Sequence, residues 1–223
     1  MTSDDTALIA RRPSLREDVC GALRAALVAG QLRPGEVYSA PRLARQFGVS
    51  ATPVREALLQ LVTEGLLRAV PNKGFRVVEI SEPDLDEIAA LRHLLEAPAV
   101  GELARRPHQA GLLALREQAG QICAAADDGD VIRYLEADLA FHLGMLAALG
   151  NRRLVAMVRE LRAQTRLYGL SRLAHSGQLA ASAREHLDLL DLVRAGDAPG
   201  AEALMRRHIG HTRGIWASST IIR

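Results

Sequence analysis

The chain has 223 residues, of which 48% are hydrophobic and only 3% are aromatic, so the predicted core is aliphatic. Its length favours two domains, and the lack of aromatic platforms argues against a protein that binds single-stranded nucleic acid. The net charge is only +2, with 11 basic against 8 acidic residues over residues 1–80 and 17 against 18 over residues 81–223. The N-terminal part is the more basic one, as expected of a DNA-binding module.

The N-terminus and the cysteines indicate the compartment. Residues 1–12 form a polar tail with Asp4 and Asp5, and they lack the apolar stretch of a secretion signal. Cys20 and Cys123 lie far apart in helical patterns, which favours free thiols in a reducing environment. No run approaches the ~18 apolar residues of a membrane span. We therefore expect a cytoplasmic protein without a membrane segment.

The first predicted element is a helix that starts at Ser14 and ends at Gly30, followed by a turn over residues 32–36. A short helix is expected next, over residues 41–47. Gly48 follows it directly and suits the left-handed backbone conformation at a helix C-terminus. The pattern therefore predicts two helices that are separated by a turn and stopped by glycines.

The stretch after Gly48 predicts a third helix. Ser50 or Thr52 can cap this helix, and Pro53 is tolerated in its first turn, where a backbone N–H has no partner. The apolar residues share one face, whereas Thr52 and Arg55 point outward. Two short helices joined by a tight glycine turn form a helix-turn-helix, whose second helix enters the DNA major groove. An ordinary helical hairpin would show the same spacing.

The continuation favours the DNA-binding interpretation. Residues 66–70 and 75–80 are compatible with strands and flank Pro71-Asn72-Lys73-Gly74, which is typical of a hairpin tip. A basic hairpin directly after a recognition helix is a wing. The sequence here resembles the GntR family of bacterial transcription regulators, in the segments Leu43-Ala44, Gly48-Val49-Ser50, Thr52-Pro53-Val54-Arg55-Glu56-Ala57-Leu58, Glu64-Gly65-Leu66 and Pro71-Asn72-Lys73-Gly74-Phe75.

The resemblance implies a winged helix-turn-helix domain over residues 13–80 that binds double-stranded operator DNA. Two-fold operators require two-fold proteins, so a homodimer is expected. The candidate DNA contacts are Arg42, Arg45, Ser50, Ala51, Thr52, Pro53, Arg55, Asn72, Lys73 and Gly74. Many relatives have Arg where this chain has Ala51, so the base pair that is read there is expected to differ.

The second domain, over residues 81–223, is predicted to be all-helical. Ser81 is a suitable N-cap, and Pro83 lies in the first turn of the helix that follows. Helical patterns then run over residues 82–105, 109–126, 130–149, 151–169, 179–195 and 197–218. Short breaks between them favour an antiparallel bundle, and Pro98 is expected to kink the first helix. The predicted fold class is therefore mainly α, with β structure only in the wing.

Polar residues occupy positions that should face the core of the bundle. Asp138 and His142 are four residues apart and share a face with Leu135 and Met145. His186 and His208 repeat the oddity on two other helices. A single histidine of this kind usually belongs to the core, but three histidines and an aspartate on three helices favour a metal site. This donor set suits Zn²⁺ most, with Ni²⁺ or Mn²⁺ as alternatives.

These residues carry a second resemblance, to the FCD effector domain of FadR-type GntR regulators. The matching motifs are Arg92-x-x-Leu95-Glu96, Asp138-x-x-x-His142, Asn151, Glu185-His186 before Leu189-Leu190, Gly196-Asp197 and Arg206-Arg207-His208-Ile209. The resemblance implies that Asp138, His142, His186 and His208 bind a divalent metal. His211 is expected to lie outside this ligand set. Together the two resemblances cover about residues 14–215.

The resemblance also implies a small organic acid as effector, such as a hydroxy acid, a sugar acid or a dicarboxylate. Arg92 lies on the apolar side of its helix and has two interpretations: a salt bridge to Glu96, or a clamp on the effector carboxylate. Arg133, Arg162 and Arg166 are weaker candidates for the same contact.

Two functions fit these features: a ligand-responsive transcription regulator, and a metal-dependent hydrolase or lyase fused to a DNA-binding module. A catalytic metal also keeps open positions, so the ligand set does not separate them. We expect no Asp or Glu on the apolar faces beside the histidines except Glu96, which Arg92 can neutralise. A regulator without enzymatic activity is therefore predicted, and a repressor is favoured, although no residue distinguishes repression from activation.

Overall fold

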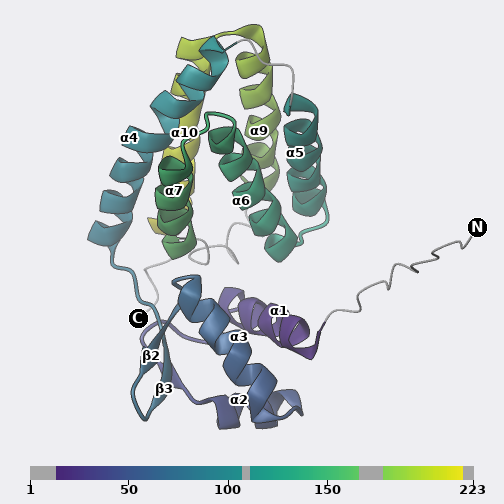
Figure 1. The fold of residues 1–223 in the computed structure, drawn as a ribbon, viewed down its shortest axis with the longest axis vertical. Coiled ribbons are helices and arrows are strands. Elements are labelled where there is room, and N and C mark those ends of the chain that lie inside the picture. The colour runs from purple at the N-terminus through teal and green to yellow at the C-terminus, as the bar shows by residue number, and fades with distance from the viewer. Residues whose placement is uncertain (1–13, 107–110, 166–177, 218–223) are drawn as a thin grey trace, which may run out of the picture.

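The computed structural model describes residues 14–106, 111–165 and 178–217 (Figure 1). As predicted, the fold is mainly helical, with a winged helix-turn-helix followed by a helical bundle. The N-terminal domain contains α1 (Leu15–Val28), β1 (Val37–Tyr38), α2 (Ala40–Phe47), α3 (Ala51–Thr63), β2 (Leu67–Val70) and β3 (Gly74–Val77). The bundle contains α4 (Glu82–Arg105), α5 (Leu112–Asp127), α6 (Val131–Ala147), α7 (Arg152–Thr165), α9 (Gln178–Ala195) and α10 (Ala198–Ala217). The predicted tail at residues 1–12 lies outside the described residues.

Two helices begin with the same capping device. The Ser14 hydroxyl accepts a hydrogen bond from the Glu17 N–H over 3.3 Å, and the Ser14 N–H donates to the Glu17 carboxylate over 2.7 Å. Ser81 and Asp84 repeat this exchange at the start of α4, over 3.3 and 2.9 Å. A cap of this kind is worth about 1 kcal/mol, which explains why both helices start next to the predicted serines.

The turn between α2 and α3 has the predicted glycine geometry, because Gly48 adopts φ 67° and ψ 29°. The predicted side-chain cap on α3 is absent, however. Ser50 occupies the N-cap position, but its hydroxyl makes no capping hydrogen bond, and Thr52 lies inside the first turn. Both side chains are exposed instead, so the first backbone N–H groups of α3 are left uncovered by these hydroxyls.

The wing is part of a three-stranded antiparallel sheet in the order β1-β3-β2. Strand β1 was not predicted, because two residues are too few for an alternating pattern. The last strand ends at Val77 and not at residue 80, as was predicted. In the pairing of β1 with β3, Tyr38 lies opposite Phe75. Gly74 has φ 132°, and a Cβ atom at this position would lie 2.4 Å from the carbonyl oxygen of Tyr38. Only glycine therefore allows β3 to approach β1 this closely.

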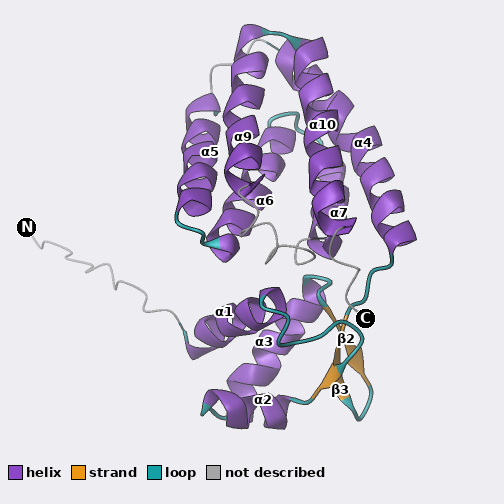
Figure 2. Ribbon diagram, turned by 180° about the vertical axis from the view of Figure 1, so that it is seen from behind, coloured by secondary structure: helices purple, strands orange, loops and turns teal. Residues whose placement is uncertain are grey.

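Each domain has its own aliphatic core. In the N-terminal domain, Leu23 of α1 packs with Leu58 and Leu61 of α3 and with Phe75 of the wing. In the bundle, α4 lies along α10, and α5 packs against α6 and α9 (Figure 2). Pro98 does not end α4, which continues to Arg105. Among the described residues, no helix is both long and apolar enough to cross a membrane.

The N-terminal domain lies at one end of the bundle in both views (Figures 1 and 2). Arg24 of α1 contacts Glu64 at the end of α3, with 2.6 Å between Nη2 and Oε1. Its Nη1 also lies 3.8 Å from Oε1 of Glu136 on α6. One guanidinium therefore lies between the C-terminus of the predicted recognition helix and the helix that carries Asp138 and His142.

Candidate metal centre and DNA-binding surface

Three bundle helices bring the predicted metal ligands together. Asp138 and His142 lie one turn apart on α6, His186 comes from α9, and His208 comes from α10. The three histidines are fully buried, and Asp138 is half-buried. Each residue offers one ligand atom, and these four atoms all lie within 4.8 Å of one another.

The atoms that meet are the inner ring nitrogens and one carboxylate oxygen. Nε2 of His186 lies 3.1 Å from Nε2 of His142 and 3.1 Å from Oδ1 of Asp138. The distance from Nε2 of His142 to the same Oδ1 is 3.5 Å. Two imidazole nitrogens at this separation share at most one hydrogen between them, so at least one nitrogen lone pair faces the other donors. This fits a divalent cation.

Burial sets the charge states that a cation needs. Burial and the charge of Arg162 lower the pKa of His142 well below its ordinary value, and burial lowers the pKa of His208 to about 4. Burial alone would raise the pKa of Asp138, but its contacts with His142 and His186 and the positive charge of Arg162 hold it well below its ordinary value. At neutral pH, His142 and His208 are therefore neutral and Asp138 is ionised, which are the deprotonated forms that bind a metal.

A chain of alternating charges leads from α4 to this site. Nε of Arg92 donates to Oε1 of Glu96 over 2.6 Å, and Arg162 donates to Oε2 of Glu96 from Nη2 and Nε over 2.5 and 2.9 Å. Nη1 of Arg162 then donates to Oδ2 of Asp138 over 3.0 Å. Burial alone would raise the pKa of Glu96, but the charges of Arg162 and Arg92 lower it to about 2. Glu96 is therefore ionised, and the two arginines compensate its negative charge inside the bundle.

The arginines that were predicted as candidates for effector binding differ in their surroundings. Arg92 makes the salt bridge to Glu96 that sequence analysis gave as one of its two interpretations. Arg162, a weaker candidate, lies between Glu96 and Asp138. Arg133 is exposed at the start of α6, where its Nη1 lies 3.3 Å from Oδ2 of Asp128, so it lies outside this charge chain. Arg166 lies outside the described residues.

Glu185, the residue before His186, was quoted from the sequence only as part of the FCD motif, and its contact with His208 was not predicted. The prediction was that no spare acid except Glu96 lies on the apolar faces beside the histidines, and both oxygens of Glu185 are engaged. Oε2 of Glu185 lies 2.8 Å from Nδ1 of His208, and Oε1 lies 3.0 Å from Nδ1 of the exposed His211. No spacing within one helix reveals this contact, since it forms between α9 and α10.

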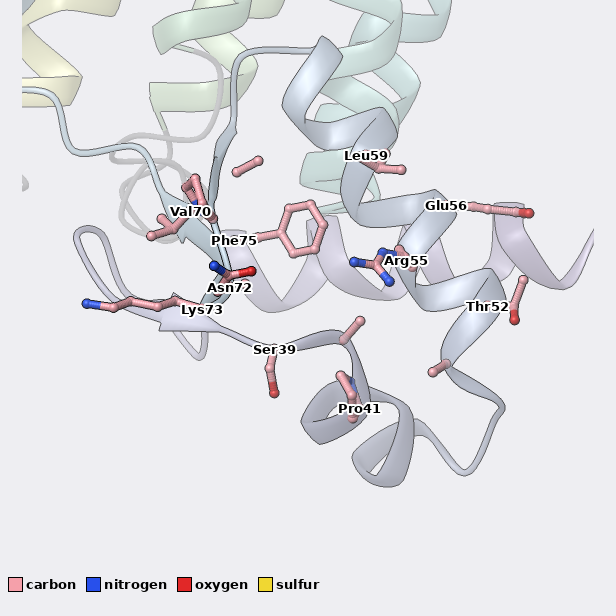
Figure 3. A pocket seen from close by; sticks show the side chains of 15 residues that line it. Ser39, Pro41, Thr52, Arg55, Glu56, Leu59, Val70, Asn72, Lys73 and Phe75 are labelled. Carbon is pink, nitrogen blue, oxygen red and sulfur yellow. The ribbon is translucent and has the colours of Figure 1, made fainter.

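A second surface lies on the N-terminal domain (Figure 3). It is a groove of about 830 Å³ between the outward face of α3, the start of α2 and the wing. The predicted contacts Ala51, Thr52, Arg55, Asn72, Lys73 and Gly74 line it, together with Ser39, Pro41, Glu56 and Leu59. In Figure 3, Arg55 points from α3 toward the hairpin, and Lys73 extends outward from the hairpin tip. Arg42 and Arg45 are exposed on α2, where the Arg42 guanidinium lies 5.8 Å from the centre of the Tyr38 ring.

Comparison with known protein families identifies the two domains. Residues 15–77 match the family of bacterial regulatory proteins named gntR, and residues 87–211 match the FCD domain. The chain belongs to the GntR family. Both resemblances seen in the sequence are thereby confirmed, including the FCD-containing, FadR-type branch.

Relatives of this GntR protein are known in Escherichia coli (strain K12). The HTH-type transcriptional regulator McbR is 32% identical over 193 residues, which cover 84% of this chain and 86% of McbR. The HTH-type transcriptional repressor GlaR is 31% identical over 193 residues, which cover 82% of this chain and 87% of GlaR. The structure of E. coli McbR/YncC aligns with a TM-score of 0.70 and 28% identity, covering 93% of this chain and 99% of that one.

These relatives are transcription regulators, the class of protein that was predicted for this chain. The geometry agrees with this assignment. Each Glu185 oxygen contacts a histidine, and each Glu96 oxygen contacts an arginine. The two acids nearest the candidate metal ligands are thus already engaged rather than available as a general base.

Proposed function

We propose that this GntR protein is a cytoplasmic, homodimeric transcriptional repressor. Its operator affinity changes when a small organic acid binds at a metal in its FCD domain. The observation that carries the proposal is the convergence of Oδ1 of Asp138 with the inner nitrogens of His142 and His186, close to His208, inside the bundle. Zinc is the proposed ion, and nickel and manganese suit the same donors. Such an ion supplies a Lewis-acidic position for a carboxylate when it is bound.

The charge balance supports an anionic effector. Around the site lie two guanidiniums, Arg92 and Arg162, which contact Glu96 and Asp138, and a third carboxylate, Glu185, which contacts His208. Adding a divalent ion leaves a net charge of one positive unit in a largely buried region. Because an uncompensated buried charge is costly, a bound carboxylate would lower that cost. Arg162 is the nearest guanidinium, since it already contacts Asp138, and Arg92 would act on the effector through Glu96.

The groove on the N-terminal domain supports major-groove recognition. Thr52 and Arg55 project from α3 and are proposed to contact bases or nearby phosphates, and Ala51 offers an apolar contact. The uncapped start of α3 offers N–H groups suited to phosphate. Lys73 and Gly74 would reach the backbone or minor groove, and Arg42 and Arg45 would bind phosphates.

Control of DNA binding requires the effector to prefer one arrangement of the two winged domains. The structure offers two routes for this coupling. One is α4, which starts at Glu82 soon after β3 ends at Val77 and carries Arg92 and Glu96. The other is Arg24, between Glu64 and Glu136. Support for a dimer comes from α4 as well, where Leu94 remains 69% exposed and Leu91 47% exposed in the single chain.

The test uses full-length protein purified without chelator and an operator selected from random duplex DNA. Metal content, molar mass by light scattering, and a thermal-shift screen of small organic acids are measured on the parent and on His186→Ala. We expect bound metal, a dimer mass, and hits that stabilise only the parent and change its operator affinity by ~5–150-fold. Hits that stabilise His186→Ala equally well would place the effector elsewhere. A parent protein that contains no metal and binds neither added zinc nor added nickel would rule out the metal site.

A further inference from the structure

We infer that Glu185 is a positioning residue for the metal centre, because it contacts Nδ1 of His208 and so leaves Nε2 as the nitrogen of that ring that can bind a metal. The inference rests on the metal site proposed above. It assigns to Glu185 a role that does not require contact with the metal or the effector.

The contact fixes where the proton of His208 lies. Oε2 of Glu185 is 2.8 Å from Nδ1 of His208, and Oε1 is 3.0 Å from Nδ1 of His211, one turn further along α10. An ionised carboxylate only accepts hydrogen bonds, so Nδ1 of each ring must carry the hydrogen. A neutral His208 with its hydrogen on Nδ1 has its lone pair on Nε2. That is the tautomer required of a metal ligand at this nitrogen.

Two other candidate ligands are oriented by comparable outer contacts. Nδ1 of His186 lies 3.1 Å from the carbonyl oxygens of both Ser182 and Ala183 in its own helix. Oδ2 of Asp138 is held by Arg162, which leaves Oδ1 to face the histidines. His208 differs because its orienting group comes from the neighbouring helix. The position of its ring therefore depends on a side chain of α9 rather than on the backbone of α10.

Removing such an outer partner has a measurable consequence. A carboxylate that accepts from a ligating imidazole fixes its tautomer and increases its basicity, and loss of the partner typically weakens metal binding by ~10–100-fold. Glu185→Ala should show this loss. Glu185→Gln should show a smaller loss, because the amide oxygen can accept the same hydrogen bond without the negative charge. Asp188→Ala, which removes an exposed carboxylate one turn along α9, should leave zinc affinity unchanged.

The experiment is zinc titration of full-length protein against a competing chelator, combined with ¹⁵N spectra of the imidazole rings. For the parent and Glu185→Gln, we expect His208 with its hydrogen on Nδ1 and zinc on Nε2. For Glu185→Ala, we expect the weaker affinity and a mixed tautomer signal for His208. Circular dichroism checks the fold of each variant. If Glu185→Ala fails to fold, the zinc affinity and ring spectrum of Glu185→Gln, relative to Asp188→Ala, decide the question.

The outcomes distinguish the proposed role of Glu185 from the proposed metal site. Parent zinc affinity and an unchanged His208 spectrum in Glu185→Ala would overturn the role of Glu185 while leaving the metal site intact. A parent protein that binds no zinc would overturn the metal site, and the role of Glu185 with it.

Discussion

Arg162 donates a hydrogen bond of 3.0 Å to Asp138, which ties α7 to a candidate metal ligand on α6. The same guanidinium also contacts Glu96 on α4, so three helices meet at one buried side chain. Arg162→Ala would leave two carboxylates without this partner in the bundle.

We predict that Arg162→Ala destabilises the protein by ~3–5 kcal/mol, since removing one partner of a buried ion pair strands the other. Urea denaturation monitored by circular dichroism measures this loss. Arg159→Ala is the matched control, because Arg159 is exposed on the same helix. Equal unfolding midpoints for the two variants would contradict a structural role for the Arg162 contacts.

Protonation of His142 and His208 should not limit metal affinity near neutrality. Burial keeps the pKa of His208 at about 4 and that of His142 well below its ordinary value, so protons do not compete for these donors at pH 7. We expect no loss of zinc affinity from protonation of His142 or His208 between pH 8 and about 6, and a fall at lower pH as these two donors become protonated. Chelator competition across this range measures it. Imidazole ¹⁵N spectra that show His142 or His208 taking up a proton near pH 6.5, the value of an exposed histidine, would contradict the assignment.

The metal-free form should lose stability in acid over a defined window. In the unfolded chain, histidines take up protons near pH 6.5, whereas His208 in the folded chain does so only near 4. The unfolded state therefore binds more protons between these values, and the free energy of unfolding falls as the pH drops from about 6.5 toward 4. Urea titrations of the chelated protein at several pH values test this. His208→Asn should flatten part of the dependence.

Arg55 and Lys73 should affect operator binding in different ways. If Arg55 reads a base, Arg55→Ala costs ~1–3 kcal/mol and relaxes specificity at that base pair, whereas Lys73→Ala weakens binding to all sequences and reduces the salt slope by ~1. Binding to selected and scrambled duplexes at several salt concentrations distinguishes them. Arg152→Ala, on the exposed surface of α7, is the control. Unchanged operator affinity for Arg55→Ala would contradict the proposed docking of α3.

Two glycines in left-handed backbone regions should differ in their tolerance of alanine. Gly48 has open space around the position of a Cβ, so Gly48→Ala should cost only the backbone strain of about 1–2 kcal/mol. In Gly74→Ala the new methyl group would collide with the backbone of Tyr38, so the loss should be larger and should affect the wing first. Thermal unfolding and hydrogen exchange of the β3 amides measure both variants. A smaller loss for Gly74→Ala would show that β1 and β3 can separate without cost.

Sequence patterns predicted most of the fold because the helices are long and amphipathic and have clear stop signals. Gly48 and Ser81 mark element boundaries by local backbone chemistry, which the sequence displays directly. Strand β1 was missed because its two residues gain their structure from pairing with β3 and not from any local preference.

The candidate site could be predicted only in part, for a similar reason. The four metal ligands stand out as polar residues on apolar faces, a property of each helix alone. The contacts of Glu185 with His208 and of Arg162 with Asp138 join different helices, so they depend on how the bundle packs. Arg133 shows the converse: its residue type suited an effector contact, but it lies exposed at the start of its helix beside Asp128.

The position of Glu96 between Arg92 and Arg162 also constrains how this protein can evolve. Replacing any one residue of the Arg92–Glu96–Arg162–Asp138 chain by an uncharged residue leaves an unbalanced charge in the bundle. Replacing all four by apolar residues removes the imbalance. Sequences with only some of these residues replaced are therefore less stable than the fully charged or the fully apolar set, so the four positions are energetically coupled. Among homologues, these four positions should change together, and lineages that abandon the ligand site should show aliphatic residues at all of them.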